Sequence, residues 1–137
     1  MENERLVNNF KFWVDKEIIH CKIFNNFDGT KEIDDLENIF LNQIFKLSGD
    51  VHMPILFDME DLNFTNAIKV FKFLSNNTLI KSLVLSKTFL VHSLPSQISL
   101  NIQSFLCNPG APDLIFKNSK SAVKFCINDT RTYNSLN

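Results

Sequence analysis

Short apolar runs alternate along this chain with segments whose apolar residues recur every three or four positions. The runs have the length of buried strands and occupy residues 10–14, 18–24, 54–57, 87–93 and 114–116. Strands that are joined through helices pair in parallel by right-handed crossovers, whereas a tight turn makes two strands antiparallel. The alternation therefore predicts an α/β fold in the order ββαβαβαβα, with a mixed sheet that is parallel except for its first strand.

The first two runs predict a β-hairpin. Apolar and polar residues alternate through residues 18–24, so that His20 and Lys22 share one face of the strand. Residues 15–17 form the tight turn, although no Asn-Gly or Asp-Gly pair fixes its type.

The periodic segments predict four helices, each with an apolar side that faces the core. The expected core-facing residues are Ile33, Leu36, Phe40, Ile44 and Leu47; Ala67, Val70, Phe71 and Leu74; Ile98, Ile102, Phe105 and Leu106; and Ala122, Val123, Phe125 and Cys126. Residues 79–85 have no clear period.

Capping and turn residues mark the ends of these helices. The expected N-terminal signals are Asp28 or Thr30, Thr65 or Asn66, Pro95, and Asn118 or Ser119, and the expected stops include Gly49 and the turn at Pro109 and Gly110.

Length and charge limit the classes of partner. The sequence fits one domain over residues 1–137, with polar tails at 1–9 and 129–137. The net charge is -1, the lysines are scattered, and the only arginines are Arg5 and Arg131. Nucleic-acid binding requires clustered cations, so we expect no nucleic-acid partner. No apolar run reaches the roughly 20 residues that span a bilayer, so we expect no membrane insertion.

The cysteines point to a reducing compartment. Cys21, Cys107 and Cys126 lie far apart, form no CxxC pair and follow no secretory signal. Their odd number fits reduced thiols, so we expect a cytoplasmic protein.

Three stretches resemble the STAS family, which includes bacterial anti-sigma-factor antagonists and the cytoplasmic tails of sulfate transporters. They are the opening FWVDKEII at 12–19, LFDMEDLNF at 56–64, and LIFKNSKSAV at 114–123, which is similar to the close of a divergent STAS-like branch. The resemblance implies a regulatory domain that binds other proteins. It covers the order of elements along nearly the whole chain, through short motifs.

The phosphorylated motif of signalling STAS domains is absent. The family places Asp, Ser, a second Ser or Thr, and Gly at the start of the second helix, where this chain has Asn66, Ala67, Ile68 and Lys69. The nearest hydroxyl belongs to Thr65, for which an N-cap role is the simpler interpretation. We therefore expect an interaction module that lacks the usual phosphoacceptor serine.

The expected partner-binding face is the crest where the parallel strands end and the helices begin. Polar residues follow two of the predicted strands there, in the loops 58–66 and 93–97. The candidate residues are Asp58, Glu60, Asp61, Thr65, Asn66, His92, Ser93 and Ser96. The expected partner at this face is a protein of unknown identity, and self-association into a homodimer is a further hypothesis.

A carrier of an apolar small molecule or lipid is the alternative hypothesis. The chain has 14 Phe but one Trp and one Tyr, and Phe71, Phe73 and Phe89 could line a pocket. AT-rich codon usage explains the same surplus, so the surroundings of Phe73 discriminate between core and pocket.

Catalysis has little support in the sequence. The three histidines share no metal-ligand spacing with one another or with the cysteines. Asp58 and His92 end two predicted strands, where a carboxylate and an imidazole could act as acid and base. No nucleophile motif or Gly-rich phosphate loop accompanies them. We therefore expect no catalytic residues, no metal and no cofactor.

Overall fold

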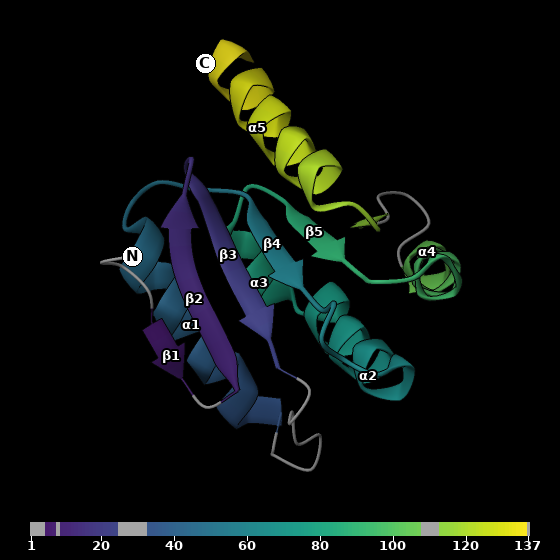
Figure 1. Ribbon diagram of the computed structural model, residues 1–137. Coiled ribbons are helices and arrows are strands. Elements are labelled where there is room, and N and C mark those ends of the chain that lie inside the picture. The colour runs from purple at the N-terminus through teal and green to yellow at the C-terminus, as the bar shows by residue number, and fades with distance from the viewer. Residues whose placement is uncertain (1–4, 8, 25–32, 108–112, 137) are drawn as a thin grey trace.

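The computed structural model describes residues 5–7, 9–24, 33–107 and 113–136, which form an α/β fold around one mixed sheet. The strands lie side by side in the order β1-β2-β3-β4-β5-β6, and Figure 1 labels the first five of them. The strands are β1 (Arg5–Val7), β2 (Phe10–Asp15), β3 (Ile18–Ile23), β4 (Ile55–Asp58), β5 (Lys87–Leu90) and β6 (Leu114–Phe116). The helices are α1 (Ile33–Ser48), α2 (Phe64–Asn76), α3 (Thr78–Leu83), α4 (Leu94–Cys107) and α5 (Ser119–Leu136).

The predicted sheet topology is confirmed. The β2–β3 pair is antiparallel, and the β3–β4, β4–β5 and β5–β6 pairs are parallel. The structure adds β1, which pairs antiparallel with β2. Describing residues 1–9 as a polar tail was therefore wrong for Arg5–Val7, because a three-residue strand is too short to show a period.

The β2–β3 turn takes the left-handed backbone that tight hairpins need. Lys16 and Glu17 have φ values of 55° and 61°. Two successive residues with positive φ characterise a type I′ turn, whose twist matches that of the flanking strands. Residue types alone did not reveal this geometry, because neither position is Gly, Asn or Asp.

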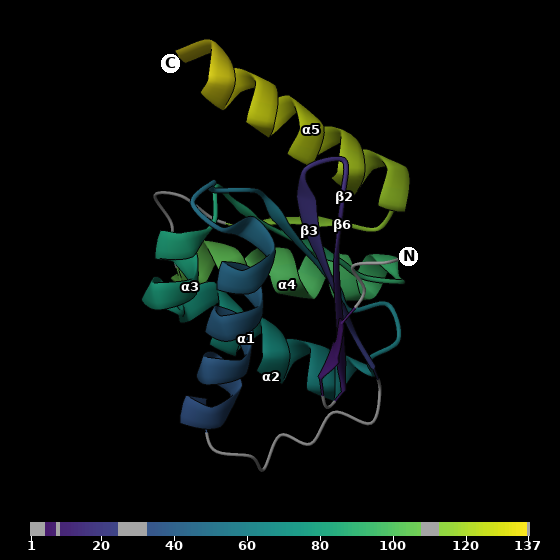
Figure 2. The same cartoon turned by 90° about the vertical axis from the view of Figure 1, so that its left-hand side faces the viewer.

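The larger core lies on the side of the sheet that α1, α2 and α3 cover. Figure 2 shows these three helices together on one side of the strands, with α5 apart from them. The predicted inward faces of α1 and α2 are confirmed where their side chains are described. The buried residues there are Leu36, Phe40 and Ile44 of α1 and Ala67, Val70, Phe71 and Leu74 of α2.

Helix α5 covers part of the other side of the sheet. Its Ala122 and Cys126 pack against Ile18, Leu56 and Leu90. The helix continues to Leu136, so the prediction of a polar tail at residues 129–137 was wrong. The polar residues of its last turns are exposed but helical.

One further prediction about the helices was wrong, and one helix lies where the sequence made no prediction. The N-cap of α2 is Asn63, whose side chain accepts a hydrogen bond from the Asn66 amide, so Thr65 lies inside the first turn. Helix α3 forms where no period was visible, and its N-cap is Asn77. The expected signals at Asp28, Thr30, Pro109 and Gly110 lie outside the described residues.

The largest difference from the sequence prediction concerns α4. Ile98, Ile102, Phe105 and Leu106 were expected to face the core, but all four are exposed. The buried residues of this helix are instead Ser96, Leu100 and Ser104.

Candidate interaction surface

Helix α4 turns its apolar side away from the rest of the molecule. Its five large exposed side chains are 51% to 70% exposed and belong to Leu94, Ile98, Ile102, Phe105 and Leu106. Spacings of three, four and seven residues place them on one side of the helix. We call this set the α4 stripe.

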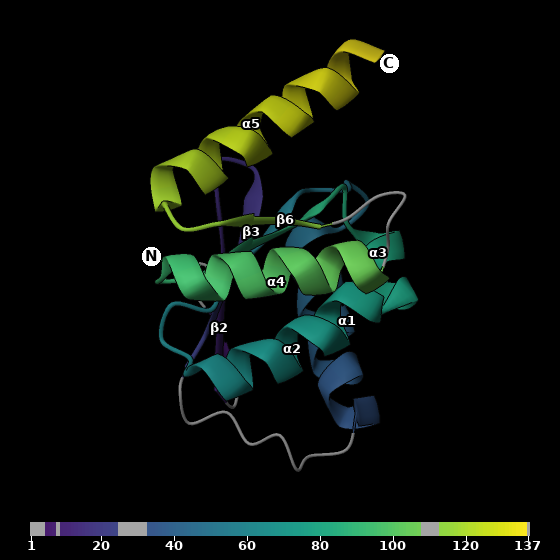
Figure 3. The same cartoon turned by 90° about the vertical axis from the view of Figure 1, so that its right-hand side faces the viewer.

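The inward side of α4 carries polar residues beside the buried Leu100, because the helix lies on the open edge of β6. Gln97 Nε2 donates to the Ile115 carbonyl at 3.1 Å, and Ser104 Oγ donates to the Asp113 carbonyl at 3.1 Å. Edge strands carry unpaired backbone groups that need such partners or a cover. Figure 3 shows α4 running alongside β6, between α2 and α5. The polar side of α4 therefore contacts the edge strand, and its apolar side is exposed.

The composition of α4 reinforces this arrangement. The helix, LPSQISLNIQSFLC, contains no charged residue. Surface helices of globular proteins usually present a charged or polar side to water, and α4 has no charged side to present. This uncharged composition was the available sequence signal that the helix differs from the others.

A polar cluster lies beside the start of α4, at the carboxyl ends of β3, β4 and β5. Asp58 ends β4 and pairs in register with Lys22 of β3. The Asp58 Oδ1 atom accepts a hydrogen bond from the Glu60 amide at 2.9 Å. His92 follows β5 and acts electrostatically on Glu60. The structure thus brings Asp58, Glu60 and His92 together as expected, and adds Lys22.

The electrostatics of this crest are dominated by its carboxylates. Partial burial, and then the negative charge of Asp58, raise the pKa of Glu60, while Lys22 and His92 act in the opposite direction. The side chain of Asp58 serves the backbone of its own loop, as Asp side chains commonly do in turns. The cluster therefore presents net negative charge on a short, hydrogen-bonded loop.

The other predicted crest residues have different surroundings. Asp61 and Thr65 are exposed, and Asn66 is partly buried. Ser93 Oγ donates to Ser96 Oγ at 3.0 Å and accepts from the Ser96 amide, so both serines stabilise the start of α4. Ser96 is buried and faces the fold.

The part of the sheet that α5 leaves open carries an aromatic pair that sequence reasoning did not single out. Trp13 and His20 stack with ring centroids 5.0 Å apart. Burial lowers the pKa of His20, against the opposing effects of Asp15 and Asp58. His20 Nε2 is buried and has no hydrogen-bond partner among the described residues. The ring is thus held neutral beside Trp13.

Lys87 is a buried lysine that links the amino end of β5 to the last turn of α2. Lys87 Nζ donates to the carbonyls of Leu74 and Ser75, in the last turn of α2, at 3.0 and 2.9 Å. It lies 3.7 Å from Asp113, which accepts a hydrogen bond from Ser75. Burial lowers the pKa of Lys87, opposed by Asp113. These contacts give the ammonium group a structural role at the C-terminus of α2.

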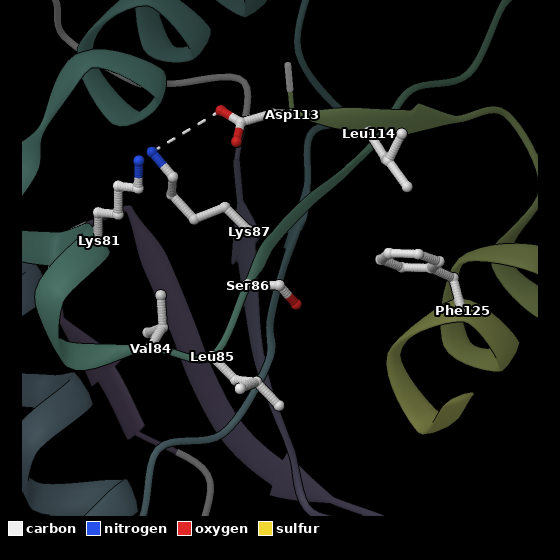
Figure 4. A pocket seen from close by; sticks show the side chains of 8 residues that line it. All are labelled: Lys81, Val84, Leu85, Ser86, Lys87, Asp113, Leu114 and Phe125. Atoms are coloured by element: carbon white, nitrogen blue, oxygen red, sulfur yellow. Dashed lines mark ion pairs between the residues drawn. The ribbon is translucent and has the colours of Figure 1, made fainter. Parts of the chain in front are cut away.

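Lys87 and Asp113 lie at one end of a cavity of about 310 Å³. Figure 4 shows Lys81, Lys87 and Asp113 at one end, and Leu114 and Phe125 at the other. The neighbouring Ser86 hydroxyl also has no partner among the described residues. The cavity is at the amino ends of β5 and β6, away from the crest.

The three phenylalanines proposed for a pocket pack against other rings. Phe71 and Phe89 are fully buried and meet edge to face, with centroids 4.7 Å apart. Phe73 packs against Phe40 at 6.3 Å. Phe73 is partly buried and packs against the core, so it is part of the core or of an interface and does not support the carrier.

The two cysteines whose side chains are described are free and buried. Burial raises the pKa of Cys126 to about 11 and that of Cys21 well above its usual value, so neither is a ready nucleophile at neutral pH. Among the residues that the structure describes, no three His, Cys, Asp or Glu side chains are grouped to hold a metal ion. No described helix has the length and apolar character needed to cross a membrane.

Comparisons with protein-family models, curated proteins and solved structures gave no match. The assignment of a function therefore depends on the chain's own surfaces.

Proposed function

We propose that this chain is a non-enzymatic, STAS-like interaction module that pairs with a second copy of itself through the α4 stripe. The polar crest beside the stripe then remains available for a further protein partner. The order of elements and the missing phosphoacceptor serine support a regulatory domain that is not controlled at the usual site. The buried free thiols of Cys21 and Cys126 suit a reducing cytoplasm.

The exposed α4 stripe is the observation that carries this proposal. Five large apolar side chains that are each at least half exposed present on the order of 500 Å² of apolar surface, near the upper end for the largest patch of a monomeric protein. Patches of this size commonly mark interaction sites. Pairing two copies would bury about 1,000 Å² in total, the lower limit for a specific interface.

A second copy fits the stripe because the stripe is compatible with itself. A twofold axis brings the same patch of both subunits together, so any charge in it would meet its like. No residue of α4 is charged, so two stripes can pair without repulsion. Charged residues are depleted from the centres of such interfaces, and apolar and aromatic residues fill them.

Sedimentation equilibrium of purified protein tests the proposal. Wild-type protein should show reversible monomer–dimer association, and Ile98→Asp should weaken it at least 100-fold by burying an unpaired carboxylate at the contact. Leu79→Asp is the matched control, because Leu79 is also 51% exposed but lies on α3. The control should associate like the wild type.

Two results would contradict the proposal. One is a wild-type chain that remains monomeric at millimolar concentration. The other is an Ile98→Asp variant that associates as well as Leu79→Asp, since that would place the contact elsewhere. Circular dichroism of both variants verifies that the fold is retained.

The crest has its own test once a protein partner is in hand. Replacing both Asp61 and Thr65 by Ala should weaken that partner's binding without unfolding the domain, because both side chains are exposed. Unchanged binding by the double variant would remove the crest from the proposal and leave the α4 contact in place.

A further inference from the structure

A basic groove lies between α5 and the β2–β3 turn, separate from the α4 stripe and the crest. Its volume is about 440 Å³. The lining residues are Lys16, Ser119, Lys120, Val123, Lys124, Ile127, Asn128 and Arg131. Half of these residues are cations and none is an acid, although the chain as a whole has a net charge of -1.

The groove follows one side of α5. Its helical residues span 119–131 and recur at steps of one, three and four, so they line a strip about 18 Å long. Lys120 and Lys124 are one turn apart, with about 5–6 Å between Cβ atoms, and can contact one anion together. Arg131 extends the positive charge two turns further, and all three side chains are exposed.

The hairpin supplies the fourth cation from a distant part of the sequence. Lys16 is at the tip of the β2–β3 turn, which lies next to α5 in Figures 1 and 2. The turn is held in place because Ile18, two residues later, packs in the same cluster as Ala122 and Cys126 of α5. The left-handed backbone at Lys16 further fixes the tip.

The nearby acids do not line the groove. Asp15 acts electrostatically on His20, and Glu17 lines a different cavity beside Tyr133. One carboxylate oxygen of Asp129 is buried. Val123 and Ile127 add two apolar side chains to the lining of the groove.

From this arrangement we infer that the basic groove binds a small, soluble anion that carries two or more phosphate groups. Four cations around one cavity favour a multivalent anion over a monovalent one, because each additional phosphate meets a further cation. The guanidinium of Arg131 can hold two phosphate oxygens at once, and the lysines act as point charges. The fold thus brings Lys16 to the same groove as the three cations of α5.

Isothermal titration calorimetry with pyrophosphate and tripolyphosphate at low salt tests this inference. Wild-type protein should bind one anion per chain, and the affinity should fall as sodium chloride is raised from 50 to 300 mM. Lys124→Glu should lower the affinity at least tenfold, since it removes a charge-assisted contact and adds repulsion. Lys16→Asn should also lower it, because Asn tolerates the left-handed backbone while removing the charge.

The matched control is Lys69→Glu, which makes the same charge change at an exposed position on α2. It should bind like the wild type. The inference is overturned if neither anion binds, or if Lys124→Glu and Lys69→Glu lose affinity equally. Binding to phosphatidylglycerol vesicles without binding to either anion would also overturn it, in favour of a membrane surface. Ile98→Asp should leave anion binding unchanged, so the groove and the α4 contact can fail separately.

Discussion

Helices α2 and α4 lie next to each other and have similar apolar periodicity, yet they bury opposite sides. Helix α2 places Ala67, Val70, Phe71 and Leu74 in the core. Helix α4 buries Ser96, Leu100 and Ser104 and exposes its other large apolar residues. The difference follows from what each helix covers, because α2 lies on the apolar face of the sheet and α4 on its polar edge.

This comparison shows that periodicity identifies a helix but not the direction of its apolar side. Apolar side chains that are buried against a sheet face stabilise the fold by roughly 25 cal/mol per Å² of buried apolar surface. An edge strand has unpaired carbonyls and requires donors. Among the described residues, no side chain covers the apolar side of α4, and we therefore assign it to a contact with a second copy of the chain.

Removing one large ring from each helix should produce the largest contrast. Phe71→Ala should lower the free energy of unfolding by about 3–5 kcal/mol, because it opens a cavity beside Phe89. Phe105→Ala should change it by less than about 0.5 kcal/mol, because the ring is 60% exposed. Urea unfolding at a protein concentration that keeps the chain monomeric measures both. Similar losses in the two variants would mean that α4 is packed like α2.

The donors that hold α4 on the β6 edge should have intermediate effects. Gln97→Ala and Ser104→Ala should each cost about 1 kcal/mol, because the first leaves the Ile115 carbonyl of β6 without its partner and the second the Asp113 carbonyl just before β6. Asn101→Ala, at an exposed position of the same helix, is the control. The same urea experiment applies, and a loss in the control equal to that in the two variants would argue against edge capping.

Acidification should lower the stability of the fold without weakening the α4 contact. This is the smallest of the expected effects. Burial lowers the pKa of His20 in the folded chain. As the pH falls through about 6.5, His20 is therefore protonated in the unfolded chain while it stays neutral in the folded chain. The free energy of unfolding should therefore decrease as the pH falls below about 6.5. His20→Gln should flatten this dependence.

The α4 stripe contains no titratable side chain, so the dimer dissociation constant should stay constant over the same pH range. Unfolding curves and sedimentation between pH 5.5 and 7.5 provide the two readings. A dissociation constant that follows the stability would place a titrating group in the contact.

The sequence was sufficient for the parts of the fold that depend on local patterns. Alternation in residues 18–24 predicted the hairpin, and the three- and four-residue steps predicted α1 and α2 with their buried faces. The crest residues Asp58, Glu60 and His92 could be grouped because parallel strands end at the same edge.

The remaining features depend on contacts between distant residues. The direction of α4 depends on carbonyls of β6 that no local pattern reveals. The basic groove needs Lys16 beside Lys120 and Lys124, which only the packing of α5 against Ile18 provides. The N-cap of α2 is Asn63 and not the predicted Thr65. Either side chain could accept hydrogen bonds from the free amides at that helix start, so the residue types alone did not decide between them.

Disulfide formation at the centre of the stripe tests the central claim most directly. In a pair related by a twofold axis, residues near the middle of the stripe meet their own copies, so Ile102→Cys should form an intermolecular disulfide under mild oxidation. The variant is made with Cys107→Ser, and Leu79→Cys in the same background is the control. Our account predicts a covalent dimer for Ile102→Cys at concentrations where the control stays monomeric. Equal cross-linking of the two variants, or none at Ile102→Cys, would contradict it.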